Sequence, residues 1–599
     1  MTDLQFIGKA FGPYKREVAL AAVCIFIETT LELCIPVLMS SVIDDGVMAG
    51  DVAVVWLRGA AIVIVAAIAL VLGQGYARFS ARAAMGLGAN LRREQFAQVQ
   101  RYSFENLDRF EASGLVTRMT TDVTVIQNAL VSGFRPMMRG PVLLVMGLIL
   151  SFFMSPTLAL VFCFVLPFLA LVLFFIVRRV GPLYRVLQGR MDRLNNVLQE
   201  DLTAIRAIKA FVREGYAAER FGDVNEGLAK TATDTFSGAV LNTPAFQLAM
   251  YVSCTAMLWI GGHLILAGEL SVGTLTGFMS YVLQIMNSLM MISNVFLLLA
   301  RALTSIERVR EVLDEKPTIL SPSGEAAVRE VADGSVEFRG VDFKYGADAQ
   351  NDVLAGVDLR FGPGTTIGIL GGTGSGKTSL VQLIARFYDV DTGSVLVGGR
   401  DVRDYDLGVL RDAVGIVLQS NVLFSGTVRE NLLWGDADAT DEELLAACRV
   451  ACADEFLDRI GGLDGDLGQG GVNVSGGQKQ RLCIARALVK RPRILIFDDS
   501  TSAVDMATDA KIREGLAGLS GVTKIVVAQR VASVRDADQI VILEEGRVHA
   551  TGTHESLVAA ADPIYLELCE SQGVQTKAVE TKGGASAAAP VSADEGEVR

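Results

Sequence analysis

The sequence predicts two different folds in one chain: an all-α membrane domain of six helices, followed by a soluble α/β domain. Two observations support this. Apolar stretches long enough to cross a bilayer lie within the first 300 or so residues. The rest of the chain reads as a soluble α/β domain and carries a glycine-rich loop between an apolar strand and a helix. With 599 residues, the chain is long enough for two or more domains.

The stretch 140–177 contains no charged residue and is too long for one span of about 20 residues, but right for two. Ser155 and Pro156 in its middle predict a tight turn between these two helices. The remaining four spans share a predominantly apolar composition and are expected near residues 18–42, 54–76, 236–268 and 270–300.

The basic residues predict the orientation. Arginines gather in the connectors 77–134 and 178–235, whereas the loop after the first span carries Asp44, Asp45 and Asp51. Because cytosolic loops carry the excess of Lys and Arg, both termini and both connectors are expected in the cytosol. The connectors are amphipathic, and we expect them to be helices that continue beyond the bilayer.

Charge and cysteine content exclude two function classes. The net charge of −13, with no basic cluster, argues against nucleic acid as a partner. None of the eight cysteines forms a CxxC pair or a Cys/His cluster, so buried reduced thiols are expected instead of a metal site.

The glycine-rich loop has the pattern and the setting of a P-loop, since it follows the strand 366–370 and opens a helix. Its backbone amides and the helix N-terminus can wrap phosphate groups. Lys377 is expected to reach the β- and γ-phosphates, and Thr378 to supply a hydroxyl to Mg²⁺. The residues predicted to bind ATP here are Gly371, Gly372, Thr373, Gly374, Ser375, Gly376, Lys377, Thr378 and Ser379.

A second acidic element follows the buried strand 494–497, where Asp498 is placed to hold Mg²⁺. Between the two elements lies a further motif, Ser475, Gly476, Gly477 and Gln478. This Ser-Gly-Gly-Gln sequence between a P-loop and its acidic strand resembles the signature of ATP-binding cassette (ABC) proteins. The membrane half resembles the six-helix exporter type, so the resemblance implies a membrane all-α six-helix exporter domain plus a cytosolic α/β P-loop ATP-binding cassette.

The resemblance assigns further roles. Tyr345 resembles the aromatic residue that stacks on adenine, and Gln419 the glutamine that senses Mg²⁺. Residues 502–505 resemble the loop that crosses the dimer interface, and 552–555 the closing motif. Residues 107–110 and 209–214 look like the two cytosolic turns that dock onto cassettes.

The expected domain organisation has five parts. They are an N-terminal elbow segment (1–16), the transmembrane domain with its cytosolic extensions (17–310), a linker (311–335), the cassette (336–572) and a disordered tail (573–599).

Three positions depart from the pattern of an active cassette. Asp499 stands where the family carries the glutamate that activates water, and Gln529 where it carries a histidine near the γ-phosphate. Gln469, before the signature, replaces a glutamate found in many exporters. This triple pattern resembles the degenerate half of bacterial heterodimeric ABC exporters of the multidrug type. It implies ATP bound but slowly hydrolysed here, and a signature motif that completes the catalytic site of a second, non-identical half-transporter.

The resemblance implies ATP-driven export of amphipathic, drug- or lipid-like molecules across the bacterial cytoplasmic membrane. Three alternatives stay open at this point: a peptide or lipid exporter, a homodimeric exporter with two slow sites, and a cassette-gated channel.

Candidate cargo-binding residues lie in the first and last spans. Glu28 and Glu32 are four residues apart and share one helix face, where a carboxylate inside the membrane is costly. They either face a water-filled cavity that attracts cationic substrates or are satisfied by neighbouring helices. Met286 and Met290 either line an adaptable pocket or serve ordinary helix packing.

Overall fold

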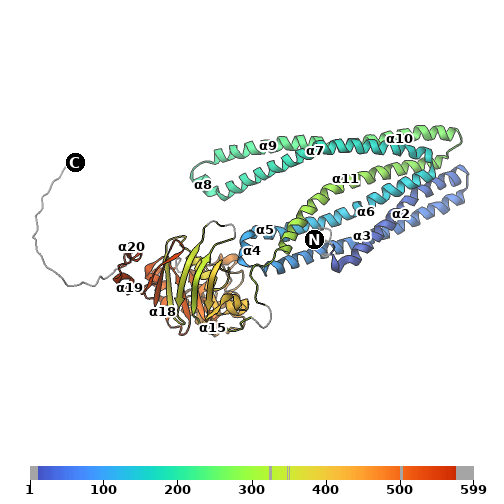
Figure 1. Ribbon diagram of the computed structural model, residues 1–599. Helices are drawn as coiled ribbons and strands as arrows, with labels where there is room; N and C mark the ends of the chain where they lie inside the picture. Colours follow the sequence, from blue (N-terminus) through green and yellow to red (C-terminus); the bar gives the residue numbers. More distant parts are fainter. Residues whose placement is uncertain are drawn as a thin grey trace, which may run out of the picture. The chain divides into compact units, whose positions relative to one another are not determined.

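The computed structural model describes residues 8, 11–322, 327–346, 349, 351–499 and 504–574. The chain forms two compact units (Figure 1). The membrane unit comprises Met1–Gln100 and Ala112–Glu315, and the cassette unit comprises Arg101–Glu111 and Lys316–Arg599. A short piece of the first connector therefore belongs with the cassette.

Six helical stretches of the described chain are long and apolar enough to cross a membrane, which confirms the predicted number of spans. Each contains at least 18 residues with high mean hydropathy and few charges, as a hydrocarbon environment requires. They are Gly12–Met48, Val52–Val99, Ala112–Met154, Pro156–Thr203, Glu214–Leu266 and Val272–Ser293.

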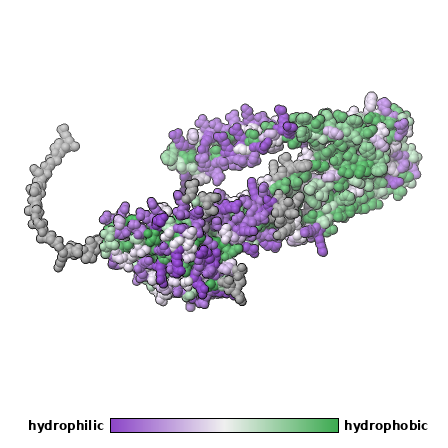
Figure 2. All heavy atoms as spheres, viewed as in Figure 1, coloured by the Kyte–Doolittle hydropathy of each residue, from purple (hydrophilic) through white to green (hydrophobic). Residues whose placement is uncertain are grey.

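The helices of the membrane unit continue well beyond one bilayer thickness, as the amphipathic connectors predicted. Hydrophobic residues cover one end of this unit, and hydrophilic residues cover most of the arm that includes α9, whose tip at α8 is hydrophobic (Figure 2). Its long helices are α2 (Lys15–Ser41), α3 (Val52–Val99), α6 (Val123–Met154), α7 (Pro156–Thr203), α9 (Glu214–Val240), α10 (Asn242–Leu266) and α11 (Val272–Asp314), with short helices α5 (Ala112–Thr117) and α8 (Ile205–Ala210).

The predicted turn between α6 and α7 is confirmed. Ser155 has extended backbone angles, φ −156° and ψ 106°, and its hydroxyl accepts the N–H of Leu158 at 3.4 Å. Pro156 is the first residue of α7. The N–H at this position has no partner within a helix, so proline, which lacks it, costs no hydrogen bond there.

Two sheets build the cassette. A four-stranded antiparallel sheet has the order β2-β1-β4-β5, and a six-stranded, mostly parallel sheet has the order β10-β9-β3-β8-β7-β6. The strands are β1 (Val336–Phe343), β2 (Leu354–Phe361), β3 (Thr366–Gly371), β4 (Thr392–Val397), β5 (Arg400–Asp401), β6 (Val414–Val417), β7 (Ile494–Asp498), β8 (Thr523–Val527), β9 (Gln539–Glu544) and β10 (Arg547–Gly552).

Short helices surround these sheets and complete the hydrophobic cores of the cassette. They are α4 (Phe104–Arg109), α12 (Lys377–Ile384), α13 (Leu407–Ala413), α14 (Val428–Leu432), α15 (Asp441–Val450), α16 (Asp454–Leu457), α17 (Gly476–Val489), α18 (Met506–Ala517), α19 (His554–Ala559) and α20 (Pro563–Ser571).

The strand order determines which residues meet. Strands β3, β8 and β7 lie side by side and run parallel, so their carboxyl ends share one edge of the sheet. The P-loop follows β3, Gln529 follows β8 and Asp499 follows β7. Ligands of open parallel sheets bind at this edge, so the candidate site is expected here.

Candidate nucleotide site

The P-loop connects β3 to α12 and leaves open space beside its backbone. Gly374 and Gly376 have φ of 82° and 91°, a region that favours glycine. A Cβ on Gly371 would lie 2.3 Å from the carbonyl oxygen of Leu543, whereas a Cβ on Gly372 or Gly374 would meet nothing within 4 Å. The loop thus combines a tight backbone path with free volume at a helix N-terminus, which suits the phosphates of a nucleotide.

Lys377 is the first residue of α12, and its ammonium folds back over the loop. It donates to the carbonyl oxygens of Gly371 at 2.9 Å and Gly372 at 2.7 Å. Burial lowers the pKa of the Lys377 ammonium, and the charges of Asp499 and Asp498 oppose that change. The ammonium therefore lies at the P-loop, and its contact with the β- and γ-phosphates stays a prediction.

Asp498 ends β7 and is 1% exposed. Its Oδ1 accepts the hydroxyl of Thr378 at 2.9 Å. Burial raises the pKa of the Asp498 carboxyl, while the hydrogen bond from Thr378 lowers it. A buried carboxylate beside a hydroxyl supplies the oxygen ligands that Mg²⁺ prefers, so Thr378 and Asp498 fit this ion.

Two of the three departures from the active pattern, Asp499 and Gln529, contact each other. The amide Nε2 of Gln529 donates to Oδ2 of Asp499 at 2.7 Å. The backbone N–H of Asp499 donates to the carbonyl of Val527, at the end of β8, at 3.1 Å. An amide neither takes up nor releases a proton, so Gln529 holds the carboxylate by a bond that allows no proton exchange.

Tyr345 lies against the helix that follows the P-loop. Its hydroxyl is 2.8 Å from Oγ of Ser379 and donates to Gln382 at 3.3 Å. Its ring packs edge-on against Tyr388, with centroids 5.1 Å apart. With an exposed fraction of 42%, Tyr345 keeps a surface on which a base can stack.

An aromatic chain leads from Tyr345 to the short helix α4. Tyr388 donates its hydroxyl to Asp108 at 2.7 Å, and Phe104 stacks on Phe387 with ring centroids 4.3 Å apart. Asp108 lies in the segment 107–110 that was predicted to dock onto a cassette. Phe104, Phe387 and Tyr388 are not among the residues predicted from the sequence.

The signature motif forms the N-terminus of α17. Ser475 is the N-cap residue and forms a capping box with Gln478: the backbone N–H of Ser475 donates to Oε1 of Gln478 at 2.9 Å, and the backbone N–H of Gln478 donates to the Ser475 hydroxyl at 3.4 Å. Ser475 and Gly476 are exposed, so the positive end of the helix dipole faces solvent. This surface can receive a phosphate group from outside the chain.

Two other predicted elements are partly described. Gln419 is exposed just after β6, at the same sheet edge as Asp498. Ser502 and Ala503 lie outside the described residues. Asp505, which follows them, caps α18 by accepting the N–H of Thr508 at 3.0 Å.

The acidic pair of the first span has basic partners on α6. Glu28 is 3% exposed and accepts from Arg135 at 2.5 Å, and Glu32 accepts from Arg139 at the same distance. Each carboxylate therefore has a basic partner on a neighbouring helix, although Oε2 of Glu28 is buried without a hydrogen-bond partner among the described residues. Their role in a cavity stays a prediction. Neither arginine is among the residues predicted from the sequence, although the two arginines repeat the four-residue spacing of the two glutamates.

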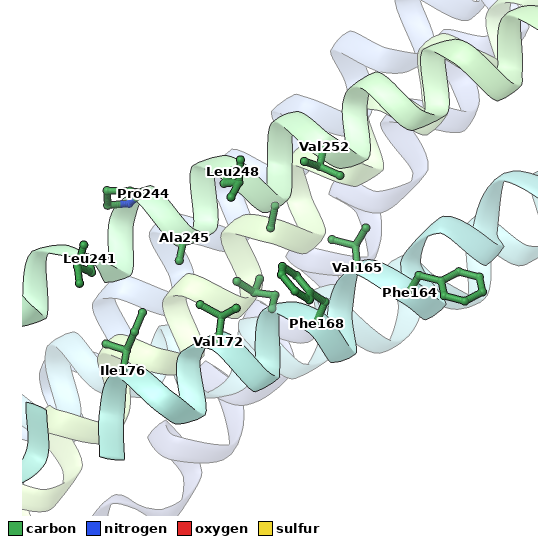
Figure 3. A pocket seen from close by; sticks show the side chains of 12 residues that line it. Phe164, Val165, Phe168, Val172, Ile176, Leu241, Pro244, Ala245, Leu248 and Val252 are labelled. Atoms are coloured by element: carbon green, nitrogen blue, oxygen red, sulfur yellow. The ribbon is translucent and has the colours of Figure 1, made fainter. Parts of the chain in front are cut away.

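Met286 is buried in the core that α11 shares with α6, α7 and α10, and Met290 packs against that core. Their contribution to a cargo pocket also stays a prediction. An apolar groove of 680 Å³ lies elsewhere, between α7 and α10 (Figure 3). Its lining includes Phe164, Phe168 and Leu248 and no charged side chain, as expected of helices that face hydrocarbon.

Comparisons with known proteins agree with this geometry. Residues 18–289 match the family described as "ABC transporter transmembrane region", and residues 354–502 match the family described as "ABC transporter". An uncharacterized ABC transporter ATP-binding protein of Mycobacterium tuberculosis is 37% identical over 576 residues, which cover 95% of this chain and 98% of that protein. The chain belongs to the ABC transporter family.

Other relatives of this ABC transporter differ in what their names state. The uncharacterized ABC transporter ATP-binding protein YfiB of Bacillus subtilis is 33% identical, covering 94% of this chain and 97% of that protein. An ATP-dependent lipid A-core flippase of Syntrophus aciditrophicus is 29% identical, with coverage of 93% and 92%.

A solved structure of a bacterial Atm1-family ABC exporter with ATP bound has the same fold. Its TM-score is 0.79 at 24% identity, with 94% of this chain and 100% of that chain covered. The chain is thus an ABC half-transporter, with a helical membrane domain fused to an ABC-type ATPase domain of exporter fold.

Proposed function

We propose that this chain is one half of a heterodimeric ABC exporter. It retains ATP at its own P-loop, hydrolyses it slowly there, and completes the catalytic site of a non-identical partner. The transporter moves amphipathic, drug- or lipid-like molecules out across the bacterial cytoplasmic membrane, with the cassette in the cytosol.

The hydrogen-bonded pair of Asp499 and Gln529 carries this proposal. Asp499 is one methylene shorter than glutamate, which shortens its reach by about 1.5 Å. Its Oδ2 already accepts from the Gln529 amide at 2.7 Å. Loss of a well-positioned general base costs about 10²–10⁴-fold in rate, so hydrolysis at this site is expected to be slow.

The main groups expected to bind ATP are not among the altered ones. The P-loop amides and Lys377 hold the phosphates, and Tyr345 stacks on the base. Thr378 and Asp498, with Gln419 nearby, would hold Mg²⁺, which would neutralise phosphate charge when bound. Binding energy is therefore available at this site even where cleavage is slow.

The intact signature supports the need for a partner. Ser475 and the exposed N-terminus of α17 offer hydrogen-bond donors. In the proposed arrangement, these donors do not contact the ATP bound at the P-loop of the same chain. In cassette pairs, each ATP lies between the P-loop of one chain and the signature of the other. A partner that carries glutamate and histidine would hydrolyse its ATP against Ser475 and Gly477.

Two cytosolic turns support coupling to transport. Helix α4 contacts the cassette through the bond between Asp108 and Tyr388. The turn after α8 exposes two apolar side chains, Phe211 (78%) and Val212 (80%), which suits docking onto a second cassette. Closure of the two cassettes on ATP would pull these turns together and switch the helices from inward- to outward-facing.

The chemical class of the transported molecule is the most specific part of the proposal. The lipid flippase among the relatives and the apolar membrane helices favour amphipathic molecules over peptides. Uptake of a fluorescent amphipathic cation and of a fluorescent phospholipid into inside-out vesicles tests this directly. An ATP-dependent uphill gradient supports an exporter, whereas flux that only dissipates a gradient indicates a cassette-gated channel.

The homodimer alternative is tested with the chain alone. Slow ATP turnover by the purified, self-paired chain, and faster turnover on adding the partner half-transporter, support the heterodimer. Brisk turnover and transport by the self-paired chain would contradict it.

A further inference from the structure

Gln572, at the C-terminal end of the cassette, contacts the backbone of the altered switch residue Gln529 and of Val531, two residues after it. It is the C-cap residue of α20. Its Oε1 accepts the N–H of Val531 at 2.8 Å, and its Nε2 donates to the carbonyl of Gln529 at 2.9 Å. One side-chain amide therefore bridges two main-chain groups that are two residues apart.

Helix α20 is fixed firmly enough to make this bridge a constraint. Tyr565 and Cys569 are fully buried and pack against Leu370, Ala528 and Val531. At the other end of the helix, Asp562 accepts the N–H of Tyr565 at 2.9 Å and lies 3.0 Å from Nε2 of His549. Because both ends of α20 are held, Gln572 cannot follow the switch loop without a cost.

The bridge reaches the residue that contacts Asp499 at the candidate nucleotide site. The peptide of Gln529 sets where its side chain starts, and that side chain donates to Asp499 at 2.7 Å. Three elements are thus linked in series: α20 through Gln572, the segment after β8 through Gln529, and the segment after β7 through Asp499.

We propose that Gln572 is a positioning residue that holds Gln529 against Asp499 and thereby slows the release of ATP from this chain's P-loop. This rests on the proposed function, because it presumes ATP at that loop. Gln572 touches neither phosphate nor Mg²⁺ in this scheme and acts only through the residue 529 backbone.

The decisive variant is Gln572→Glu, which keeps the length of the side chain. A carboxylate can still accept from Val531 N–H but cannot donate to the Gln529 carbonyl, so one of the two bonds is lost. Release of radiolabelled Mg-ATP from the full-length chain in lipid nanodiscs is expected to become about 3- to 10-fold faster, as for loss of one hydrogen bond. Ser571→Ala is the control, because its hydroxyl donates only within α20, to Leu568.

A double-mutant cycle separates positioning from general support of the fold. In a Gln529→Ala background, Gln572→Glu is expected to have no further effect on release, because the side chain it positions is gone. Equal acceleration in both backgrounds would show that Gln572 acts on the fold alone, and unchanged release in the wild-type background would refute any role.

Two further measurements separate the positioning role from loss of fold stability and from failure of the proposed ATP site. Gln572→Ala removes both bonds; if it lowers the melting temperature while Gln572→Glu leaves ATP release unchanged, the positioning role is refuted. Lys377→Ala is measured in parallel. If Lys377→Ala also leaves release unchanged, the proposed ATP site itself is wrong, whereas an effect of Lys377→Ala without an effect of Gln572→Glu refutes only the positioning role.

Discussion

The two nucleotide-facing surfaces of the cassette differ in what they retain. The signature surface keeps Ser475 and Gln478 in a complete capping box, with the helix N-terminus exposed. The P-loop surface keeps Lys377 and the pair of Thr378 and Asp498, yet its catalytic edge ends in an aspartate bonded to a glutamine. Under the proposed function, binding and cleavage therefore depend on separate groups, so a change at Asp499 and Gln529 can slow cleavage while ATP binding stays.

The largest effect is expected at the signature surface. Gly476→Asp places a carboxylate where a partner's phosphate would lie, in space that holds no atom within 4 Å. The charge stabilises the helix N-terminus but repels the phosphate, so ATPase activity of the heterodimer should fall by about 10²-fold or more. Gly476→Ala is the uncharged control, and similar losses in both variants would point to a steric effect instead.

At the P-loop surface, the expected effect of a substitution is on ATP affinity. Lys377→Ala removes the ammonium that lies over the loop, and ATP affinity at this chain's site should fall by about 10- to 100-fold, as for loss of one or two charge-assisted hydrogen bonds. Photolabelling of this chain with azido-ATP measures the change. Lys511→Ala, which removes a cation paired with Glu455 on the same cassette, should leave labelling intact.

Restoring glutamate and histidine at the P-loop surface should allow this site to hydrolyse ATP. The double change Asp499→Glu with Gln529→His supplies a longer base and a titratable partner, so this site should begin to turn over. ATPase activity of the heterodimer should rise by up to about twofold, because one active site becomes two, and ATP at this chain should be replaced by ADP. Phosphate release and nucleotide chromatography measure these two outcomes, and unchanged ATP at this chain would show that other residues limit hydrolysis.

The smallest effect is expected from Asp499→Ala. A residue that contributes little to turnover can be removed with little loss, so heterodimer ATPase should fall by less than about twofold. The matching change of the partner's glutamate should cost about 10²–10⁴-fold. Equal losses from the two changes would remove the asymmetry on which the comparison rests.

Much of the fold could be predicted because its signals are local. The charge-free stretch with Ser155 and Pro156 predicts a hairpin from about 40 consecutive residues, given a span of about 20. The P-loop lies within a single strand-loop-helix segment, so its function follows from nine adjacent residues.

The contacts within the site could not be predicted, because they depend on strand order and helix packing. Nothing in the sequence around Asp499 says that β8 lies next to β7, which is what brings Gln529 to it. Arg135 and Arg139 lie just outside the charge-free stretch, and their pairing with the acids of α2 spans 107 residues. From the sequence, Gln572 is expected only as the last residue of the cassette.

The most direct test asks which nucleotide remains on this chain after turnover. The heterodimer is given radiolabelled azido-ATP and excess Mg²⁺, allowed several turnovers and crosslinked by light, and the nucleotide on each chain is analysed. The account predicts intact ATP on the chain that carries Asp499 and ADP on its partner. ADP appearing equally fast on both chains would contradict it.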